Sequence, residues 1–389
     1  MIAGIIQESY AGERRVAIIP ATVPALAKLG LEVLVEPAAG AAAGFPDAQY
    51  RAKGATIAAS RADVFARAKL ILNVRSLAAP GGEPVADLQS VAAEQVVVGL
   101  MDCLATPQGV GILAERGATG FALELVPRIT RAQAMDVLSS TATVVGYHAV
   151  LVAATSVPRL FPMLMTAGGT LAPSKVFIIG VGVAGLQAIA TARRLGAVVS
   201  AYDVRPAVKE QVESLGARFI ELPIETESAQ DKGGYAQAQD EDFYRRQREL
   251  MAGAVAENDV VITTAAVPGK KAPILVTTEM VEKMRPGSVL VDVAAEQGGN
   301  CEATRAGETV VCGGARVIGL LNPASAVAGH ASQMFSKNLE NFLKLIVKDG
   351  ELTIDLEDEI VAGALVVRSG EVVNERVREV LGSEPPAGA

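Results

Sequence analysis

The chain has 389 residues, of which 50% are hydrophobic and only 4% are aromatic, and it contains no tryptophan. This length allows two or three domains with cores of their own, and an Ala-, Val- and Gly-rich composition is typical of α/β proteins. The formal net charge of −8 argues against nucleic acid or an anionic membrane surface as the main partner.

The cysteines and the N-terminus bear on the cellular compartment. Cys103, Cys301 and Cys312 show no CxxC spacing, so neither a disulfide framework nor a metal site is predicted. The N-terminal stretch MIAGIIQESYAGERR has a short apolar run and no basic start, unlike a secretory signal. We therefore expect a protein of the reducing cytoplasm.

Strand-like and helix-like runs alternate from residue 1 to about residue 125. Apolar runs such as IAGII, EVLVE, LILNV and VVVGLM are separated by segments such as ATVPALAKLG and SRADVFARA. Alternation of this kind predicts a largely parallel sheet covered by helices. A second series begins at Val176 and continues through DVVITTAA, SVLVDVA and RVIGLL. The predicted fold class is therefore α/β, with two Rossmann-like, doubly wound parallel-sheet domains.

The segment PRITRAQAMDVLSS, residues 127–140, lies between the two series. Thr130 and Gln133 have the T-x-x-Q spacing of a capping box, which predicts a helix that starts at Thr130. In such a helix Gln133, Asp136 and Ser139 fall three residues apart on one face. They either form a functional face or serve only the helix, with Gln133 as a cap and Asp136 favouring the helix dipole.

Two apolar helices are predicted to join the domains. Residues 137–158 carry no formal charge and are nearly long enough to span a bilayer. Their Ser, Thr, Tyr and His content favours a helix buried between domains, with a membrane span as the alternative. The second helix, over residues 331–347, would return the chain to the first domain. We therefore predict one domain of residues 1–137 with 330–389, and another of residues 138–329.

The run KVFIIGVGVAGLQAIATARRLGAVVSAYDVR carries a nucleotide-binding motif. A strand over 176–179 leads into Gly180, Gly182 and Gly185, and a helix over 184–195 follows. Gly180 permits the tight turn, Gly182 lets backbone amides approach a pyrophosphate, and Gly185 lets the helix pack close to the strand. The helix N-terminus would face the phosphates with its partial positive charge. The alternative is a turn of this kind that binds no nucleotide.

The predicted cofactor depends on the residues just after the next strand, which covers 197–202. Asp203 stands where an acid can bond both hydroxyls of the adenine ribose. This carboxylate would repel a 2′-phosphate, which favours NAD(H) over NADP(H). Arg205 is the opposing feature, because an arginine there could accommodate that phosphate. Further on, the polar segment 223–242 is predicted to be either a surface loop or a lid over a site.

Several long motifs resemble one known family. They are GERRVAIIP, PRITRAQAMDVLSS, GVGVAGLQAIATARRLGAVV, DVRPAVKEQVESLGARF, GGYA, VITTAAVPGKKAP, MRPGSVLVDVAAEQGGN and SKNLENFLKLI. Over nearly its whole length the chain resembles the soluble NAD(H)-binding component of the proton-translocating, Re/Si-specific NAD(P) transhydrogenases, and more distantly alanine dehydrogenase.

This resemblance implies roles for individual residues. At the nicotinamide end it implies positioning contacts, without acid/base chemistry, from Arg128, Gln133, Asp136 and Ser139. The other residues that it implies for cofactor binding are Gly180, Gly182, Val183, Gly185, Asp203, Val204, Arg205, Gly234, Tyr235 and Ala266. Of these, Gly234 and Tyr235 match the tip of the family's mobile loop, which favours the lid interpretation of segment 223–242.

The resemblance also implies partners. It implies a homodimer that docks onto membrane-embedded subunits at the cytoplasmic face of the inner membrane, with NADP(H) bound by a separate component. Because this sequence ends at Ala389, the membrane helices of the complex are expected on other polypeptides.

Alanine dehydrogenase is the sharper alternative function. Its reaction moves protons as well as hydride, and therefore needs a lysine and a histidine as proton carriers. Arg15 could hold a substrate carboxylate, but Arg75 stands near the lysine site and Cys103 near the histidine site. The two histidines, His148 and His330, lie in the predicted joining helices and are expected to pack there. A module that senses NAD without catalysis is a third possibility.

A second nicotinamide would accept the hydride without any proton moving to or from a protein group. Catalysis then reduces to placing two C4 atoms within roughly 3–3.5 Å of each other at a good angle. The predicted reaction is hydride transfer between NADH and NADP⁺, coupled to proton translocation by partner membrane subunits.

Overall fold

The structure is a computed structural model that describes residues 1–76, 84–223, 241–266, 269 and 271–383. The chain forms two compact units, one of Met1–Thr141 with Ala324–Ala389 and one of Ala142–Pro323. It passes from the first unit to the second within helix α6 (Val137–Ser156) and returns just before helix α11 (Ala328–Ile346).

Unit 1 is built on an eight-stranded sheet in the order β19-β18-β6-β5-β4-β1-β2-β3. Strands β1 to β6 pair in parallel, and β18 and β19 extend the sheet in antiparallel fashion at one edge. The strand order reverses at β1, so β1 and β4 flank a topological switch point. The strands are β1 (Ile2–Ile5), β2 (Glu32–Val35), β3 (Thr56–Ile57), β4 (Leu70–Arg75), β5 (Val96–Leu100), β6 (Thr119–Ala122), β18 (Leu365–Arg368) and β19 (Glu371–Val372).

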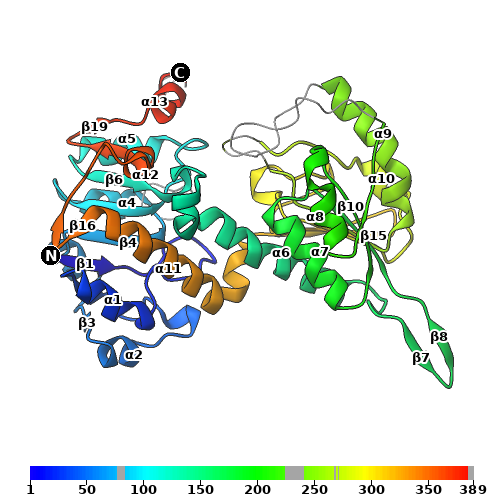
Figure 1. The fold of residues 1–389 in the computed structure, drawn as a ribbon, viewed down its shortest axis with the longest axis horizontal. Helices are drawn as coiled ribbons and strands as arrows, with labels where there is room; N and C mark the ends of the chain where they lie inside the picture. Colours follow the sequence, from blue (N-terminus) through cyan, green and yellow to red (C-terminus); the bar gives the residue numbers. More distant parts are fainter. Residues whose placement is uncertain (77–83, 224–240, 267–268, 270, 384–389) are drawn as a thin grey trace. The chain divides into compact units, whose positions relative to one another are not determined.

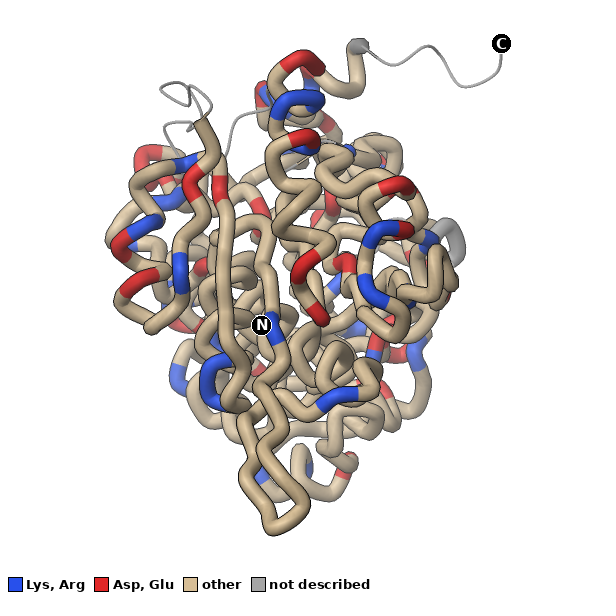
Figure 2. The backbone as a smooth tube through the Cα atoms, turned by 90° about the vertical axis from the view of Figure 1, so that its right-hand side faces the viewer, with Lys and Arg blue, Asp and Glu red and all other residues tan. Residues whose placement is uncertain are grey.

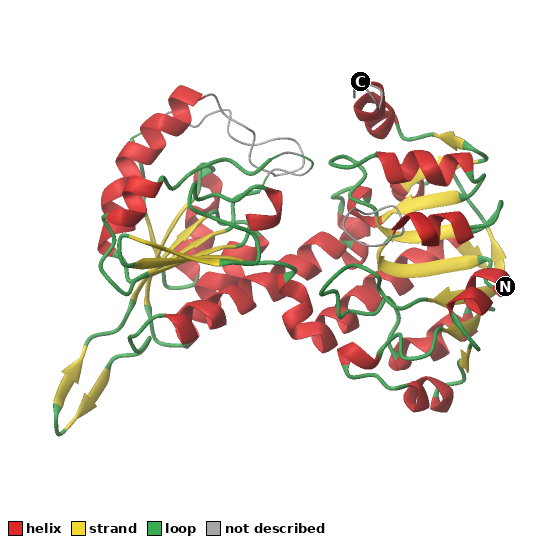
Figure 3. Cartoon of the chain, turned by 180° about the vertical axis from the view of Figure 1, so that it is seen from behind, coloured by secondary structure: helices red, strands yellow, loops and turns green. Residues whose placement is uncertain are grey.

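Helices cover both faces of this sheet (Figure 3). Leu70 and Leu72 of β4 point into one core and Ile71 into the other, as alternate residues of a strand buried on both faces must. Besides α11, the helices of unit 1 are α1 (Val23–Lys28), α2 (Asp47–Ala52), α3 (Arg61–Arg67), α4 (Pro84–Ser90), α5 (Gln108–Glu115), α12 (Glu359–Ala364) and α13 (Glu375–Ser383). A small hairpin joins β16 (Val347–Lys348) to β17 (Glu351–Leu352) after α11.

Unit 2 has a seven-stranded sheet, β11-β10-β9-β12-β13-β15-β14, which repeats the order of the first five strands of unit 1 and interchanges its last two strands. All neighbours pair in parallel except β14, which is antiparallel to β15. The switch point of this sheet lies between β9 and β12. The strands are β9 (Lys175–Ile179), β10 (Val198–Tyr202), β11 (Arg218–Phe219), β12 (Val260–Thr263), β13 (Val289–Asp292), β14 (Thr309–Cys312) and β15 (Ala315–Gly319).

Two hydrophobic cores cover the faces of the second sheet. Val176 and Ile178 of β9 pack with α6 and α7 on one face, and Phe177 and Ile179 pack with α9 and α10 on the other. Helices α7 (Val183–Arg194), α8 (Lys209–Ser214), α9 (Glu241–Glu257) and α10 (Thr278–Glu282) complete the unit. These features confirm the predicted α/β class with Rossmann-like parallel sheets.

Helix α6 is the segment for which a membrane span was the alternative. In the described part of the chain it is the one helix long and apolar enough to cross a membrane. Its side chains nevertheless serve both cores: Val137 belongs to a core of unit 1, and Ala149, Val150 and Ala153 to a core of unit 2. Helix α6 thus contributes to the cores of both units, and 39% of its most apolar stretch is buried.

A two-stranded ribbon, β7 (Leu164–Thr166) with β8 (Gly169–Leu171), extends from the sheet of unit 2 (Figure 1). Its apolar side chains are exposed, including 73% of Met165. Figure 2 shows the ribbon as a stretch of tube without a charged residue, and the sequence carries no charge over residues 160–174. The ribbon is therefore an apolar projection of unit 2.

Candidate dinucleotide site

The turn after β9 contains two glycines that the fold itself requires. Gly180 has a φ of +93°, and a Cβ there would lie 2.9 Å from the amide nitrogen of Ala265. A Cβ on Gly185 would lie 2.0 Å from the carbonyl oxygen of Gly180. Both positions are therefore closed to any side chain, as the predicted tight turn and close helix packing demand.

Gly182 differs from these two glycines. Its φ of −78° suits any residue, and a Cβ there would meet no atom within 4 Å. It is the N-cap of α7, where no side chain caps the helix and no acid occupies the first turn. The bare backbone thus leaves room and amide donors for an anionic group, which is what a bound pyrophosphate needs.

The loop after β12 packs against this turn and is fixed by hydrogen bonds. Thr264 Oγ1 donates to the carbonyl of Gly180 at 2.8 Å. The fully buried Asn300 accepts from the Ala265 amide at 3.0 Å and donates to the Ala265 carbonyl at 2.8 Å. Ala266, a predicted cofactor contact, comes directly after Ala265 and is exposed. This loop therefore holds Gly180 from the side of β12.

Asp292, at the end of β13, supports Asn300 in turn. Its carboxylate is fully buried and accepts hydrogen bonds from the amides of Ala294, Asn300 and Cys301 and from the hydroxyl of Thr304. Neither Asp292 nor Asn300 was predicted as a site residue. Their signal in the sequence was their place in the motif VDVAAEQGGN, directly after an apolar strand.

Asp203 lies at the carboxyl end of β10 and is buried. Its Oδ2 accepts from the amide of Val181, in the glycine turn, at 2.7 Å. Arg205 donates from its amide and Nε to Oδ1, at 2.8 and 2.9 Å, and from Nη2 to Oδ2 at 2.8 Å. Asp203, the residue predicted to bond the ribose, is thus hydrogen-bonded to the glycine turn. It also forms an ion pair with Arg205, the residue that could instead accommodate a 2′-phosphate.

The remaining residues predicted for this site are only partly described. Val183 and Val204 are half-buried, and Val204 packs against the core that contains α9 residues. Gly234 and Tyr235 lie outside the described residues, as does most of the predicted lid, since the description stops at Pro223 and resumes at Glu241.

In unit 1, residues 130–135 are not the α-helix that the capping-box spacing predicted. Thr130–Met135 is a 3-10 helix, η4, whose N-cap is Ile129 and has no side-chain hydrogen bond. A helical turn does begin at Thr130, but the predicted capping box and continuous helix are absent, because Asp136 caps a separate helix, α6. Its carboxylate accepts from the amide of Ser139 at 2.8 Å and from its hydroxyl at 2.6 Å.

Gln133 and Arg128 are exposed, whereas Asp136 and Ser139 are half-buried. Asp136 and Ser139 are bonded to each other, and Arg128 Nη2 donates to the Ser139 hydroxyl at 3.4 Å. Three of the four residues predicted for the nicotinamide end therefore form one hydrogen-bonded group. The fourth, Gln133, is in η4, three residues before Asp136 in the sequence.

Three residue pairs hold η4 in place. Asn338 and Asn341 of α11 both donate to the carbonyl of Ala134, at 2.9 and 3.1 Å. Arg131 makes a bidentate ion pair with Asp358, with both bonds at 2.7 Å. These supports were not predicted from the sequence. Asparagines within the apolar helical run SKNLENFLKLI were the available signal, because Asn is a poor helix former.

The residues weighed for alanine dehydrogenase chemistry are engaged elsewhere in unit 1. Arg15 is only 4% exposed, and its guanidinium forms a bidentate pair with Glu13 at 2.8 and 2.7 Å. Arg75 lies 3.8 Å from the centre of the Tyr10 ring and 3.6 Å from Glu13. Cys103 is fully buried, and burial, with the nearby Glu124, raises the pKa of its thiol.

The histidines divide between two environments. His148 in α6 is half-buried, and burial lowers the pKa of its imidazole, as expected of a packed residue. His330 lies in the first turn of α11 and is exposed. The expectation that His330 is a packed residue is therefore wrong. The first turn of α11, where His330 lies, borders a surface hollow that Arg14 and Phe45 also line.

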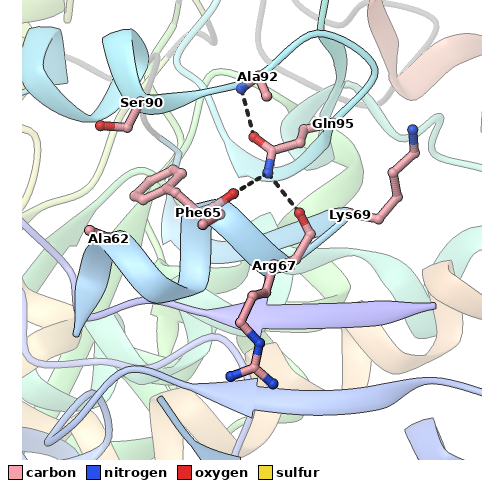
Figure 4. A pocket seen from close by; sticks show the side chains of 9 residues that line it. Ala62, Phe65, Arg67, Lys69, Ser90, Ala92 and Gln95 are labelled. Carbon is pink, nitrogen blue, oxygen red and sulfur yellow. Dashed lines mark hydrogen bonds between the residues drawn. The ribbon is translucent and has the colours of Figure 1, made fainter. Parts of the chain in front are cut away.

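Another hollow of unit 1, shown in Figure 4, lies between α3 and the segment before β5. Gln95 closes it by donating to the carbonyls of Phe65 and Ala68, both at 2.7 Å, and by accepting from the amide of Ala92. Lys69 and Gln95 precede β4 and β5, so this hollow is at the amino ends of the strands. Ligands of open α/β sheets bind at the carboxyl ends, so we assign no function to it.

Comparison with known proteins divides the chain within α6, as the two units do, but its C-terminal family model also takes in residues 324–375 of unit 1. The sequence matches the family "Alanine dehydrogenase/PNT, C-terminal domain" over residues 149–375 and the corresponding N-terminal domain over residues 4–145. It is 46% identical over 379 residues to the first section of the NAD(P) transhydrogenase alpha subunit of Rhodospirillum rubrum, covering 96% of this chain and 98% of that one. It is 31% identical to the alanine dehydrogenase of Halomonas elongata, covering 96% and 94%.

Solved structures give the same picture. A transhydrogenase crystal structure from Sinorhizobium meliloti superposes with a TM-score of 0.85 at 44% identity, covering 96% of this chain and 100% of that one. An L-alanine dehydrogenase superposes with a TM-score of 0.80 at 26% identity, covering 98% and 99%.

Proposed function

The chain belongs to the alanine dehydrogenase/PNT family, and from this premise we propose that it is the NAD(H)-binding component of a proton-translocating, Re/Si-specific NAD(P) transhydrogenase. The observation that carries the proposal is the turn after β9. Its middle glycine, Gly182, leaves a space that no side chain of the described residues fills, directly at the bare N-terminus of α7. High identity to transhydrogenase alpha subunits supports the same assignment.

In this proposal the turn residues Gly180, Gly182, Val183 and Gly185 hold the pyrophosphate. Asp203 and Val204 contact the adenosine end, Arg205 borders it through its pair with Asp203, and Ala266 lies along the cofactor. A bound NADH supplies the hydride. The chain's own contribution at the nicotinamide is orientation, for which we propose Arg128, Gln133, Asp136 and Ser139, as the family resemblance implies.

Transhydrogenation is favoured over alanine dehydrogenation by the local chemistry of unit 1. A substrate carboxylate at Arg15 would have to displace Glu13, which pairs with that guanidinium away from solvent. Cys103 is enclosed and its raised thiol pKa makes it a poor proton donor or acceptor near neutral pH. Hydride transfer to a second nicotinamide requires neither group.

The proposal includes partners. NADP(H) binds to a separate component, and membrane-embedded subunits, which hold the complex at the cytoplasmic face of the inner membrane, couple the reaction to proton translocation. We also propose that the chain is a homodimer, and the uncharged ribbon β7–β8 supports this, since an apolar projection with Met165 exposed is the kind of surface that a partner covers. Sedimentation of Met165→Asp, which should be monomeric, tests the dimer.

Substitution of Gly182 tests the nucleotide site. Gly182→Ala places its methyl group in open space, so the melting temperature should stay within about 2 °C of the wild type, as for a surface change. NADH affinity measured by calorimetry should nevertheless fall by about 10-fold or more, since the methyl group stands where the pyrophosphate approaches. Unchanged NADH affinity in a folded Gly182→Ala variant would contradict a pyrophosphate at this turn.

A further inference from the structure

The geometry of the adenosine end points to Arg205 as an internal competitor of the cofactor. We propose that its guanidinium occupies the ribose-binding face of Asp203 in the empty chain, and that cofactor binding exchanges this cation for ribose hydroxyls. Arg205 would thereby weaken NADH binding and reduce the discrimination against NADPH. The inference rests on the proposed function, because it assumes that Asp203 binds the ribose.

The hydrogen bonds on Asp203 leave no acceptor position open. Oδ1 accepts from the amide and Nε of Arg205, and Oδ2 accepts from Nη2 of Arg205 and the amide of Val181. An ionised carboxylate offers about four lone-pair positions in total. A ribose hydroxyl can therefore be accepted only after the guanidinium gives up one of its bonds.

The four bonds are not equivalent in this exchange. Two come from backbone amides, of Val181 and of residue 205 itself, and these fix the carboxylate whatever the side chain at 205. The other two come from the Arg205 side chain, and their number matches the two hydroxyls of the adenine ribose. The backbone therefore orients Asp203, and the guanidinium occupies the positions that the ribose would take.

The charge of Arg205 also affects the discrimination between NADH and NADPH. The Arg205 and Asp203 side chains are only 13% and 5% exposed, so their charges are poorly screened and largely neutralise each other. A neutralised acid repels a 2′-phosphate less than a bare carboxylate would. A displaced guanidinium, tethered two residues from Asp203, also stays near any 2′-phosphate. Both effects should make NADPH bind more tightly than it would to a chain without Arg205.

Replacement of Arg205 by alanine tests this inference through two dissociation constants. In Arg205→Ala the two side-chain acceptor positions of Asp203 are open, so the Kd for NADH should fall by about 3- to 10-fold. The Kd for NADPH should rise, so that the NADPH-to-NADH ratio of Kd values increases by about 10-fold or more. Calorimetric titration of both nucleotides at one ionic strength measures these values.

Two further variants make the test decisive. Lys209→Ala removes a cation from the same segment that pairs with Glu221 and not with Asp203, so its ratio should match the wild type. Arg205→Lys retains the charge but has one donor group in place of the fork, so NADH should bind more tightly than to the wild type, by a smaller factor. It also covers the case in which Arg205→Ala does not fold.

Weaker NADH binding in either folded Arg205 variant would overturn the inference, because it would make the guanidinium a direct cofactor ligand. An unchanged ratio with both nucleotides weakened equally would also overturn it, because that is the result of a purely structural role. Failure of the assumed nucleotide site is distinguishable, since the wild type would then bind neither nucleotide. Failure of the transhydrogenase role alone is also distinguishable, since NADH would then bind without hydride transfer to an NADP(H)-binding component.

Discussion

The three glycines of the turn after β9 belong to one motif, but different physical constraints require each of them. Gly180 and Gly185 have no room for a Cβ because neighbouring backbone atoms stand within 3 Å of it. Gly182 has room, so the protein alone gives no reason for a glycine there. A ligand that approaches the backbone does give one. The same distinction between fold and ligand applies to Asp203, whose backbone partners orient it and whose side-chain partner can leave.

Substitution of Asp203 should change cofactor preference. In Asp203→Asn one oxygen remains to accept from Val181, but the charge that bonds the ribose is lost. Hydrogen bonds to charged groups contribute about 1.5–3 kcal/mol, so NADH binding should weaken by about 10- to 100-fold. The difference between the Kd values for NADH and NADPH should become smaller, because the Asp203 charge no longer repels the 2′-phosphate of NADPH. Calorimetry on both nucleotides measures this, and a wild type that already prefers NADPH would contradict the assignment.

Gln133 should matter for the rate of hydride transfer more than for binding. Gln133→Asn shortens an exposed side chain of η4, so the melting temperature should not change. If the amide positions the nicotinamide, transfer in a system reconstituted with an NADP(H)-binding component should slow by about 10-fold or more, because catalysis here is positioning. The Kd for NADH should change much less. Parallel losses in rate and affinity would indicate an ordinary binding contact instead.

At the scale of elements, the nucleotide-binding half of the fold could be predicted closely from the sequence. The strand, turn and helix at Val176 lie within a residue or two of the observed β9 and α7, because the motif requires that geometry locally. The start of the helix near Thr130 could not be predicted as well. The spacing of Thr130 and Gln133 matched a capping box, but Asp136 caps the α-helix because its oxygens reach both the amide and the hydroxyl of Ser139.

The supports of the site were beyond sequence reasoning for a different reason. Asn338 contacts Ala134 from 204 residues away, and Asn300 contacts Ala265 from 35 residues away. Such pairs follow from the arrangement of strands and helices, which periodicity does not specify. The side chains that shape the candidate site are therefore partly local, as in the glycine turn, and partly long-range, as in these asparagines.

The link between α11 and η4 is open to a direct test. Asn338→Leu keeps a similar volume but removes the donor to the Ala134 carbonyl, so η4 should shift. Transfer in the reconstituted system should slow by about 10-fold or more through misplacement, while NADH affinity changes less. Lys337→Ala is the matched control, because Lys337 on the same helix is exposed and pairs with Glu340. Equal rates in both variants would show that Asn338 does not position η4.

The ion pair of η4 with Asp358 should be visible in the pH dependence of stability. Arg131 holds the pKa of Asp358 at about 2, below the ordinary value of 3.8. The folded chain therefore binds the proton less readily than the unfolded chain, and the stabilisation is present above about pH 4 and lost as the pH falls towards 2. Because Arg131 is half exposed, its size should stay below about 1 kcal/mol.

Asp358→Asn isolates this contribution. Asparagine still caps α12, where Asp358 accepts from the amide of Ile360 at 2.9 Å, but it carries no charge for Arg131. The difference in free energy of unfolding between wild type and variant should be constant above about pH 4 and vanish towards about pH 2. A difference that persists to the lowest pH would show that the charge of Asp358 is not the source of the stabilisation.

The two large sheets share the order of their first five strands, and their equivalent switch points differ in the residues that lie there. In unit 2 the point between β9 and β12 presents the open glycine turn. In unit 1 the point between β1 and β4 is occupied by the chain itself, because the Glu8 carboxylate accepts from the amides of Val74 and Arg75. Burial raises the pKa of Glu8 to about 8. Among the described residues, one chain therefore offers one candidate nucleotide site of this kind, which agrees with the proposal that a separate component binds NADP(H).

The last prediction rests on this count of nucleotide sites and on the engaged state of Arg15 and Cys103. The isolated chain should bind NADH and leave it unoxidised when pyruvate and ammonium are supplied, because Arg15 is paired with Glu13 and Cys103 is fully buried, so neither can serve alanine formation as the dehydrogenase reaction requires. Addition of an NADP(H)-binding component of a transhydrogenase should start rapid transfer, monitored with an NAD analogue of distinct absorbance. Gly182→Ala in the same mixture should reduce the signal in proportion to its lost NADH affinity. Alanine formation by the chain alone would favour the alanine dehydrogenase function. Tight NADH binding without hydride transfer to any such component would favour a module that senses NAD, because only the transhydrogenase passes the hydride to a second nicotinamide.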